Sequence, residues 1–155
     1  IVLVQHVDEI FAAGMAQWLA SESHMPVRLA QEGETLKPGE VLLAGTNNHL
    51  CLTADNRLVY RLEPTDQVYR PSIDVFFNSV AMHCQGEAIG ILLTGMGRDG
   101  ARGLKQMRER GFHTIAQDQA SCAVYGMPKA AAALDAAVEV LPLDKIASRL
   151  IKRLS

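Results

Sequence analysis

The stretch Ala88–Gly111, AIGILLTGMGRDGARGLKQMRERG, carries the strongest indication of fold in the chain. It opens with a short apolar run, Ala88 to Thr94, which is typical of a strand buried on both faces. Three glycines within six positions then allow a sharp backbone turn, and an amphipathic segment follows that ends at Gly111. Strand, glycine turn and helix form the unit from which open parallel sheets are built, and such sheets place their chemistry beyond the carboxyl ends of the strands. One acid, Asp99, lies in the turn.

Strand-like and helix-like segments alternate through the rest of the chain. The predicted strands are Ile1–Val4, Val27–Ala30, Val41–Ala44, His113–Gln117 and Val138–Leu141. Two further strands flank a short loop and predict a hairpin, Leu50–Thr53 and Leu58–Arg61. Helices are predicted over about residues 8–20, after Ser72 as N-cap, after Pro128 and after Pro142. The pattern predicts an α/β, doubly wound, mostly parallel sheet flanked by helices, with a small antiparallel hairpin portion.

The helical spacing of apolar residues also predicts which side chains face the sheet. For the first helix these are Ile10, Phe11, Met15, Trp18 and Leu19. For the last helix they are Leu143, Ala147, Leu150, Ile151 and Leu154.

Composition places the chain among globular proteins. Its 155 residues are 48% hydrophobic, so residues 1–155 are expected to bury a sizeable core as one domain. The formal net charge of −2 gives no reason to expect nucleic acid as a partner. Three widely spaced cysteines fit neither a metal framework nor a disulfide set, which favours a reducing, cytoplasmic setting. No apolar run approaches the ~18 residues of a membrane span, so we expect no membrane insertion.

The residues alone allow three interpretations of the central turn. Gly95–Gly100 matches the spacing G-x-G-x-x-G, and Asp118 follows at the end of the next predicted strand, as in dinucleotide-binding proteins. Against this, Asp99 would place a carboxylate at the helix N-terminus, where the pyrophosphate binds. In the second interpretation Asp99 is only the N-cap of the helix, a role that stabilises a helix by roughly 0.5–2 kcal/mol.

The third interpretation pairs Asp99 with His6. Each residue follows the carboxyl end of a predicted strand, and such ends can meet at one edge of a parallel sheet. A carboxylate that holds one tautomer of a histidine allows the ring to act first as a base and then as an acid, as in hydrolytic triads. This pairing predicts a hydrolase.

Five separated motifs resemble those of the chemoreceptor glutamate methylesterases, the CheB family, in order and in approximate spacing. The motifs are Gln5-His6, Tyr69–Phe76, Leu93–Ala101, Thr114–Asp118 and Gly126–Pro128. The similarity covers essentially the whole chain and extends through Val140–Leu143. Gln5–Asp8 and Tyr69–Pro71 are most similar to the methylesterases of Wsp-type surface-sensing systems.

The resemblance implies a Ser-His-Asp hydrolase that removes methyl groups from glutamate γ-methyl esters on the cytoplasmic helices of chemoreceptors and releases methanol. It also implies deamidation of certain receptor glutamines. By position in the motifs, His6 corresponds to the general base and Asp99 to the acid that orients it. Met96 corresponds to the residue whose backbone N–H helps to hold the oxyanion. No cofactor is implied, and the other four histidines lack metal-ligand spacing.

The family's nucleophilic serine is not found in this chain. In the family it lies on a glycine-rich turn upstream of the histidine, whereas only five residues precede His6. None of the serines present lies in a G-x-S-x-G-like elbow: Ser21, Ser23, Ser72, Ser79, Ser121, Ser148 and Ser155. The chain also begins inside a predicted strand without Met. We therefore expect a catalytic domain that is incomplete at its N-terminus, with the nucleophile and the family's receiver domain upstream.

A non-catalytic signalling module that docks on receptors is a second function class. Arg98, Arg102 and Lys105 form a basic stripe at i, i+4 and i+7 beside the predicted site, which either attracts an acidic receptor helix or is an ordinary solvated face. Arg70 either positions substrate or pairs with a neighbouring acid, and the sequence leaves both roles open.

Overall fold

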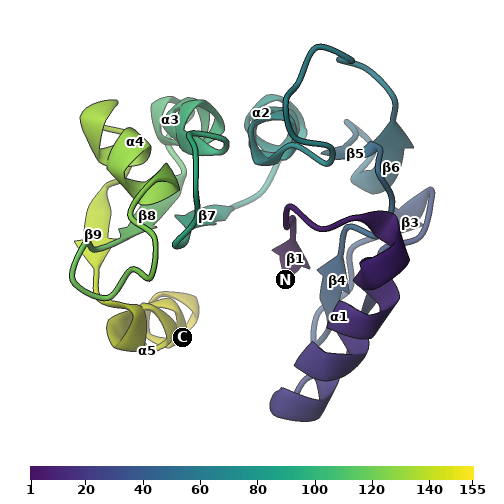
Figure 1. Cartoon of the computed structure of the whole chain (residues 1–155), viewed down its shortest axis with the longest axis horizontal. Coiled ribbons are helices and arrows are strands. Elements are labelled where there is room, and N and C mark those ends of the chain that lie inside the picture. Colours follow the sequence, from purple (N-terminus) through teal and green to yellow (C-terminus); the bar gives the residue numbers. More distant parts are fainter. The chain divides into compact units, whose positions relative to one another are not determined.

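The computed structural model describes residues 1–155, which form two compact units. The first unit spans Ile1–Gln85 and the second Gly86–Ser155 (Figure 1). Their strands assemble into three sheets of three strands, two of them parallel and one antiparallel. Helices accompany both parallel sheets along the chain. The α/β class with a small antiparallel portion is thereby confirmed.

The parallel sheet of the first unit has the strand order β1-β4-β2. Its strands are β1 (Val2–Leu3), β4 (Val41–Leu43) and β2 (Val27–Leu29). Leu3 pairs with Leu43, so β1 and β4 end side by side. Helix α1 (Glu9–Glu22) follows β1 and packs against β2.

The buried side of α1 differs in part from the predicted one. Ala12 and Ala16 are buried, whereas Ile10, Phe11 and Trp18 are 76%, 64% and 60% exposed. Small alanine side chains allow the helix backbone to lie close to β2, and the large apolar side chains then point away from the sheet. The prediction is right for Met15 and Leu19, which are half-buried on the side of Ala12 and Ala16, and wrong for Ile10, Phe11 and Trp18, because apolar residues occur on both sides of the helix.

The antiparallel sheet has the strand order β3-β6-β5. Its strands are β3 (Glu34–Thr35), β6 (Arg57–Arg61) and β5 (His49–Leu52). The predicted hairpin is confirmed as the β5–β6 pair, whereas β3 was not predicted because two residues carry no periodic signal. Helix α2 (Ile73–His83) packs on β5 and begins as predicted, since the Ser72 hydroxyl accepts a hydrogen bond from the Val75 N–H at 3.3 Å.

The second unit contains a parallel sheet with the strand order β7-β8-β9 and three helices. The strands are β7 (Ile89–Leu92), β8 (His113–Gln117) and β9 (Glu139–Leu141), and the helices are α3 (Ala101–Glu109), α4 (Met127–Ala133) and α5 (Leu143–Leu154). Ala101, Leu104 and Met107 are buried, which confirms the predicted inner side of α3. Gly111 adopts a φ of +94° and ends that helix, also as predicted.

Helix α5 presents its apolar residues differently from the prediction. Ile146 is the buried side chain of this helix, while Leu143, Ile151 and Leu154 are exposed. The wide apolar stripe in the sequence therefore overestimated how much of the helix contacts the sheet.

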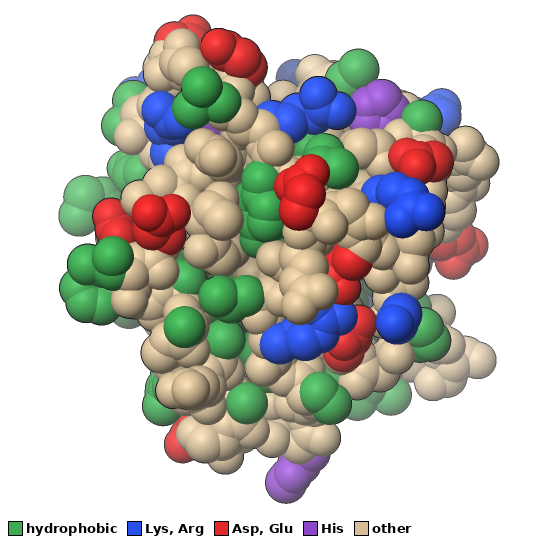
Figure 2. Space-filling view, turned by 90° about the vertical axis from the view of Figure 1, so that its right-hand side faces the viewer, with side chains coloured by type: hydrophobic (Ala, Val, Ile, Leu, Met, Phe, Trp, Pro, Cys, Tyr) green, Lys and Arg blue, Asp and Glu red, His purple; other side chains and the backbone are tan.

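One face of the molecule carries side chains of all chemical types (Figure 2). On the face drawn in Figure 2, acidic, basic and hydrophobic side chains are interspersed.

No helix combines the length and the apolar character that a membrane crossing requires. Cys51, Cys84 and Cys122 form no disulfide.

Candidate active site

His6 lies just beyond the carboxyl end of β1, where the backbone turns into α1. The turn forms because the Val7 N–H donates to the Gln5 carbonyl at 2.8 Å. Asp8 then caps α1, its carboxylate accepting a hydrogen bond from the Ile10 N–H at 3.0 Å. The turn and the cap together fix the backbone on both sides of the half-buried His6.

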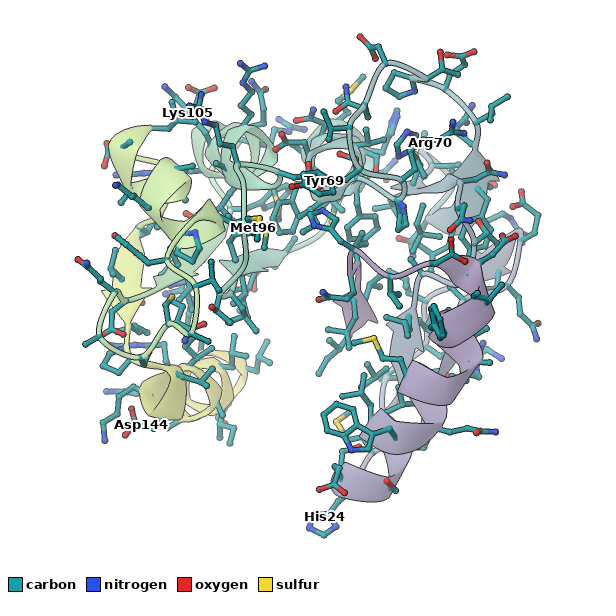
Figure 3. The ribbon with its side chains drawn as sticks, in the orientation of Figure 1. His24, Tyr69, Arg70, Met96, Lys105 and Asp144 are labelled. Carbon is teal, nitrogen blue, oxygen red and sulfur yellow. The ribbon has the colours of Figure 1, made fainter.

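The His6 imidazole stacks on the ring of Tyr69. The ring centroids are 3.9 Å apart and the ring planes differ by 7°. Tyr69 and its neighbour Arg70 belong to the loop between β6 and α2 (Figure 3). A parallel stack of this kind restricts rotation of the imidazole about its side-chain torsions, so Tyr69 orients His6.

An open hollow of about 610 Å³ surrounds this stack. It is lined by His6, Val7, Asp8, Asn47, Asn48, Val68, Tyr69 and Arg70. Asn47 and Asn48 reach the hollow because they follow β4, whose carboxyl end adjoins that of β1. Asn47 is held in place, since its side-chain oxygen accepts a hydrogen bond from the Glu9 N–H at 3.0 Å.

A fully buried histidine, His49 on β5, holds both ends of the loop that carries Tyr69. The Ser72 N–H donates to His49 Nδ1 at 3.1 Å, and His49 Nε2 lies 2.8 Å from the Pro64 carbonyl oxygen. An N–H group can only donate and a carbonyl can only accept, so the ring carries its proton on Nε2 and is neutral. His49 is thus a structural residue that positions the 64–72 segment.

Asp99 and Met96 lie together in the turn between β7 and α3 of the second unit (Figure 3 labels Met96). The turn uses Gly97 at φ +88° and Gly100 at φ +92°, conformations that favour glycine. Gly100 occupies the N-cap position of α3, so Asp99 precedes that position by one residue. Asp99 is 8% exposed, whereas Met96 is 73% exposed. The turn therefore buries its acid and presents its methionine to solvent.

Gln117, at the end of β8, stabilises this turn through side-chain hydrogen bonds. Its side-chain oxygen accepts a hydrogen bond from the Thr94 N–H at 2.8 Å, and its amide nitrogen donates to the Ser121 carbonyl at 2.8 Å. The Thr94 hydroxyl also exchanges hydrogen bonds with the backbone of Val124. The turn is thereby tied to the loop that follows the neighbouring strand.

Gly126 allows an unusually close approach of two backbone segments. The Gly126 and Met127 N–H groups both donate to the Gly95 carbonyl, at 3.1 and 2.8 Å. A Cβ at position 126 would lie 2.6 Å from that carbonyl oxygen and 3.0 Å from the Gly97 nitrogen. The glycine in the Gly126–Pro128 motif is therefore needed to position the turn that holds Met96.

Two of the serines in the chain, Ser121 in the second unit and Ser72 in the first, have structural partners. The Ser121 hydroxyl donates to the Asp118 carboxylate at 2.6 Å and accepts from the Leu143 N–H at 3.0 Å. Ser72 is the N-cap of α2. Neither residue has the environment of an activated nucleophile.

The predicted site residues are distributed over both units: His6 lies in the first, and Asp99 and Met96 in the second. The structure brings Met96 and Asp99 into one turn, and the pairing of His6 with Asp99 stays a prediction. Tyr69 and Asn47 were not predicted as site residues. Asn47 could have been found, since it follows a predicted parallel strand at the same edge as His6.

A buried acid in a glycine turn and a histidine, each beyond a parallel strand, are features of α/β hydrolytic enzymes. The model of the family described as CheB methylesterase matches residues 1–150, and the chain belongs to this family. This assignment places the Gly95–Gly100 turn in a methylesterase family rather than in a dinucleotide-binding one.

Individual relatives agree with the family. The chain is 73% identical over 150 residues to "protein-glutamate methylesterase/protein-glutamine glutaminase 3" of Pseudomonas aeruginosa, covering 97% of this chain and 45% of that protein. It is 68% identical over 151 residues to a similarly named protein of Cupriavidus metallidurans, again covering 45% of it. The crystal structure of the Thermotoga maritima CheB methylesterase catalytic domain matches with a TM-score of 0.89 and 36% identity, covering 98% of this chain and 82% of that one. The chain thus spans just under half the length of the curated relatives it matches.

Proposed function

We propose that the chain is part of a protein-glutamate methylesterase that hydrolyses glutamate γ-methyl esters on the cytoplasmic helices of chemoreceptors. The proposal includes deamidation of receptor glutamines, the second activity in the relatives' names. The observation that carries it is the 73% identity, maintained over 97% of the chain, to a protein of that name. The buried acid in a glycine turn supports the same chemistry.

In the proposed mechanism His6 is the general base. It removes the proton from a serine hydroxyl as the serine oxygen attacks the ester carbonyl, and it then returns that proton to the departing methoxide, which leaves as methanol. Water hydrolyses the acyl-enzyme by the same two proton transfers. Asp99 orients the imidazole and stabilises its protonated form. Tyr69 assists by restricting the ring.

The backbone N–H of Met96 is proposed to donate to the oxyanion that forms in each step. One such donor contributes roughly 2.7–4 kcal/mol of transition-state stabilisation in other hydrolases. The rigid turn supports this role, because Gly95, Gly97 and Gly126 fix the backbone on both sides of Met96. No cofactor or metal takes part in the proposed reaction.

The remaining parts of the proposal concern the intact protein. Residues 1–155 act as one catalytic domain, the nucleophilic serine comes from outside this segment, and a receiver domain controls the enzyme. The chain covers 45% of the relative's length, which is compatible with a nucleophilic serine and a receiver domain in the remaining part. The protein works in the cytoplasm, where the methylated receptor helices lie. The similarity of Gln5–Asp8 to Wsp-type members suggests that the substrate is the receptor of a surface-sensing system.

Methanol release by the intact protein from a methylated receptor tests the proposal. We expect release by the wild type and a loss of at least about 10³-fold in His6→Gln, because the ring supplies both proton transfers. The matched control is His24→Gln, an exposed histidine beyond the end of α1, which should leave the rate unchanged. Receptor binding without methanol release by the wild type would overturn the proposal in favour of a non-catalytic docking module.

A further inference from the structure

Arg70 is a cation without a partner in the wall of the hollow. It is half-buried, its Nε atom is buried, and that atom makes no hydrogen bond. No acidic side chain forms an ion pair with its guanidinium. Of the two roles open from the sequence, pairing with a neighbouring acid is therefore wrong.

Two of the other three arginines of the same unit pair with acidic side chains, and the third, Arg61, is exposed to solvent. Arg28 donates to both Glu34 and Glu40, at 2.7 and 3.0 Å, and Arg57 pairs with Asp55 at 3.1 Å. Arg70 differs from these arginines because it is half-buried and forms no ion pair, whereas desolvated charges are normally paired.

The one carboxylate in the wall of the hollow is already engaged. Asp8 accepts a hydrogen bond from the Ile10 N–H at 3.0 Å through Oδ1 and from the Asn47 side chain at 3.4 Å through Oδ2. It is held to the N-terminus of α1 and does not pair with Arg70. The charge of Arg70 thus stays available to a ligand that enters the hollow.

We infer that Arg70 binds a carboxylate of the protein substrate, namely an acidic side chain next to the ester in the bound helix. The inference rests on the proposed function and names a specificity determinant for it. A methyl ester is neutral and gains little from a guanidinium, whereas a carboxylate forms two parallel charge-assisted hydrogen bonds with it. On a helical substrate, residues three or four positions from the ester lie about 5–6 Å from it, within the span of one hollow.

Binding of synthetic helical peptides to the full chain tests the inference independently of catalysis. One peptide carries a glutamate γ-methyl ester flanked by glutamates at i−4 and i+3, and the other has glutamines at those positions. We expect the wild type to bind the acidic peptide about tenfold more tightly. Arg70→Gln should bind the two peptides equally, and Arg70→Lys should keep part of the preference.

Arg61→Gln is the matched control, because it removes one exposed positive charge from the same unit outside the hollow and should retain the full preference. An equal preference in the wild type and Arg70→Gln, or no peptide binding by the wild type, would overturn the inference. Displacement of the acidic peptide by free glutamate at a similar concentration would also contradict it, since the carboxylate would then not need to be part of a protein.

The peptide-binding experiment and the methanol-release experiment can fail independently of each other. Methanol release without an Arg70-dependent preference would overturn only this inference. An Arg70-dependent preference without methanol release would support the carboxylate site and overturn the hydrolase.

Discussion

His6 and Tyr69 form a parallel ring stack with a centroid distance of 3.9 Å, although the two residues are far apart in the chain. The contact joins the end of β1 to the loop between β6 and α2. That loop is in turn fixed at both ends by the buried ring of His49. The orientation of the proposed general base therefore depends on the Tyr69 ring and on the loop that His49 holds by hydrogen bonds, as well as on the backbone of His6 itself.

Replacing Tyr69 should impair catalysis while leaving the fold intact. We expect Tyr69→Leu to lower kcat for methanol release by about ten- to a hundredfold, because a loosely held imidazole spends less time in a productive orientation. Tyr69→Phe retains the stack and should stay within about twofold of the wild type. Equal activity of the leucine and phenylalanine variants would show that the stack has no orienting role.

Gly126→Ala should destabilise the second unit, because the new methyl group would lie 2.6 Å from the Gly95 carbonyl oxygen. The expected loss in free energy of unfolding is about 1–3 kcal/mol, measured by urea titration. Gly14→Ala is the matched control, since this exposed position inside α1 has nothing within 4 Å and the change should stabilise by about 0.5–1 kcal/mol. The same substitution is thus expected to have opposite signs at the two positions, and equal effects would contradict the close approach.

His49→Leu should reduce the free energy of unfolding by about 2–4 kcal/mol, because it leaves the Ser72 N–H and the Pro64 carbonyl without their buried partner. Denaturant titration of the purified chain measures this loss. His24→Leu, at an exposed position, should change stability by less than about 0.5 kcal/mol. A small effect at position 49 would mean that the 64–72 loop is fixed by other contacts.

The ion-pair cluster around Arg28 should make stability depend on pH in the acid range. Hydrogen bonds from the Arg28 guanidinium hold the pKa of the Glu34 carboxyl below its ordinary value. The unfolded chain therefore binds a proton at Glu34 at a higher pH than the folded chain does. The stabilisation is fully present above the ordinary glutamate pKa of about 4.3 and is lost as pH falls through the lowered value.

Urea midpoints between neutral pH and the acid range measure this dependence. Arg28→Gln should flatten the acid limb, whereas Arg61→Gln, which removes an exposed charge outside the cluster, should preserve it. Parallel acid limbs in the wild type and Arg28→Gln would exclude the cluster as their source.

Local patterns predicted those elements that have a local cause. The strand–turn–helix of β7 and α3 and the β5–β6 hairpin were predicted because their apolar periods and turn residues lie within short windows. The inner face of α1 was predicted only in part, because Ala12 and Ala16 are buried by the proximity of β2, a tertiary effect that apolar spacing does not encode.

In the candidate site, too, residues in local motifs were predicted and residues that act through contacts between distant segments were not. His6, Asp99 and Met96 came from motifs, and the motifs indicate residue types in a fixed order. Tyr69 acts through a ring stack and His49 through hydrogen bonds to backbone groups, both between segments distant in the chain, and no spacing rule relates them to His6. The unpaired state of Arg70 is likewise a property of its surroundings, which a sequence does not display.

The most direct test of the central claim is a double-mutant cycle on methanol release by the intact protein, with His6→Gln, Asp99→Asn and the double variant. If the imidazole and the carboxylate act as one catalytic unit, His6→Gln lowers the rate by at least about 10³-fold and the double variant is no slower than the slower single variant. If the two losses multiply, or if Asp99→Asn keeps the wild-type rate, His6 and Asp99 do not work together and the proposed mechanism is wrong.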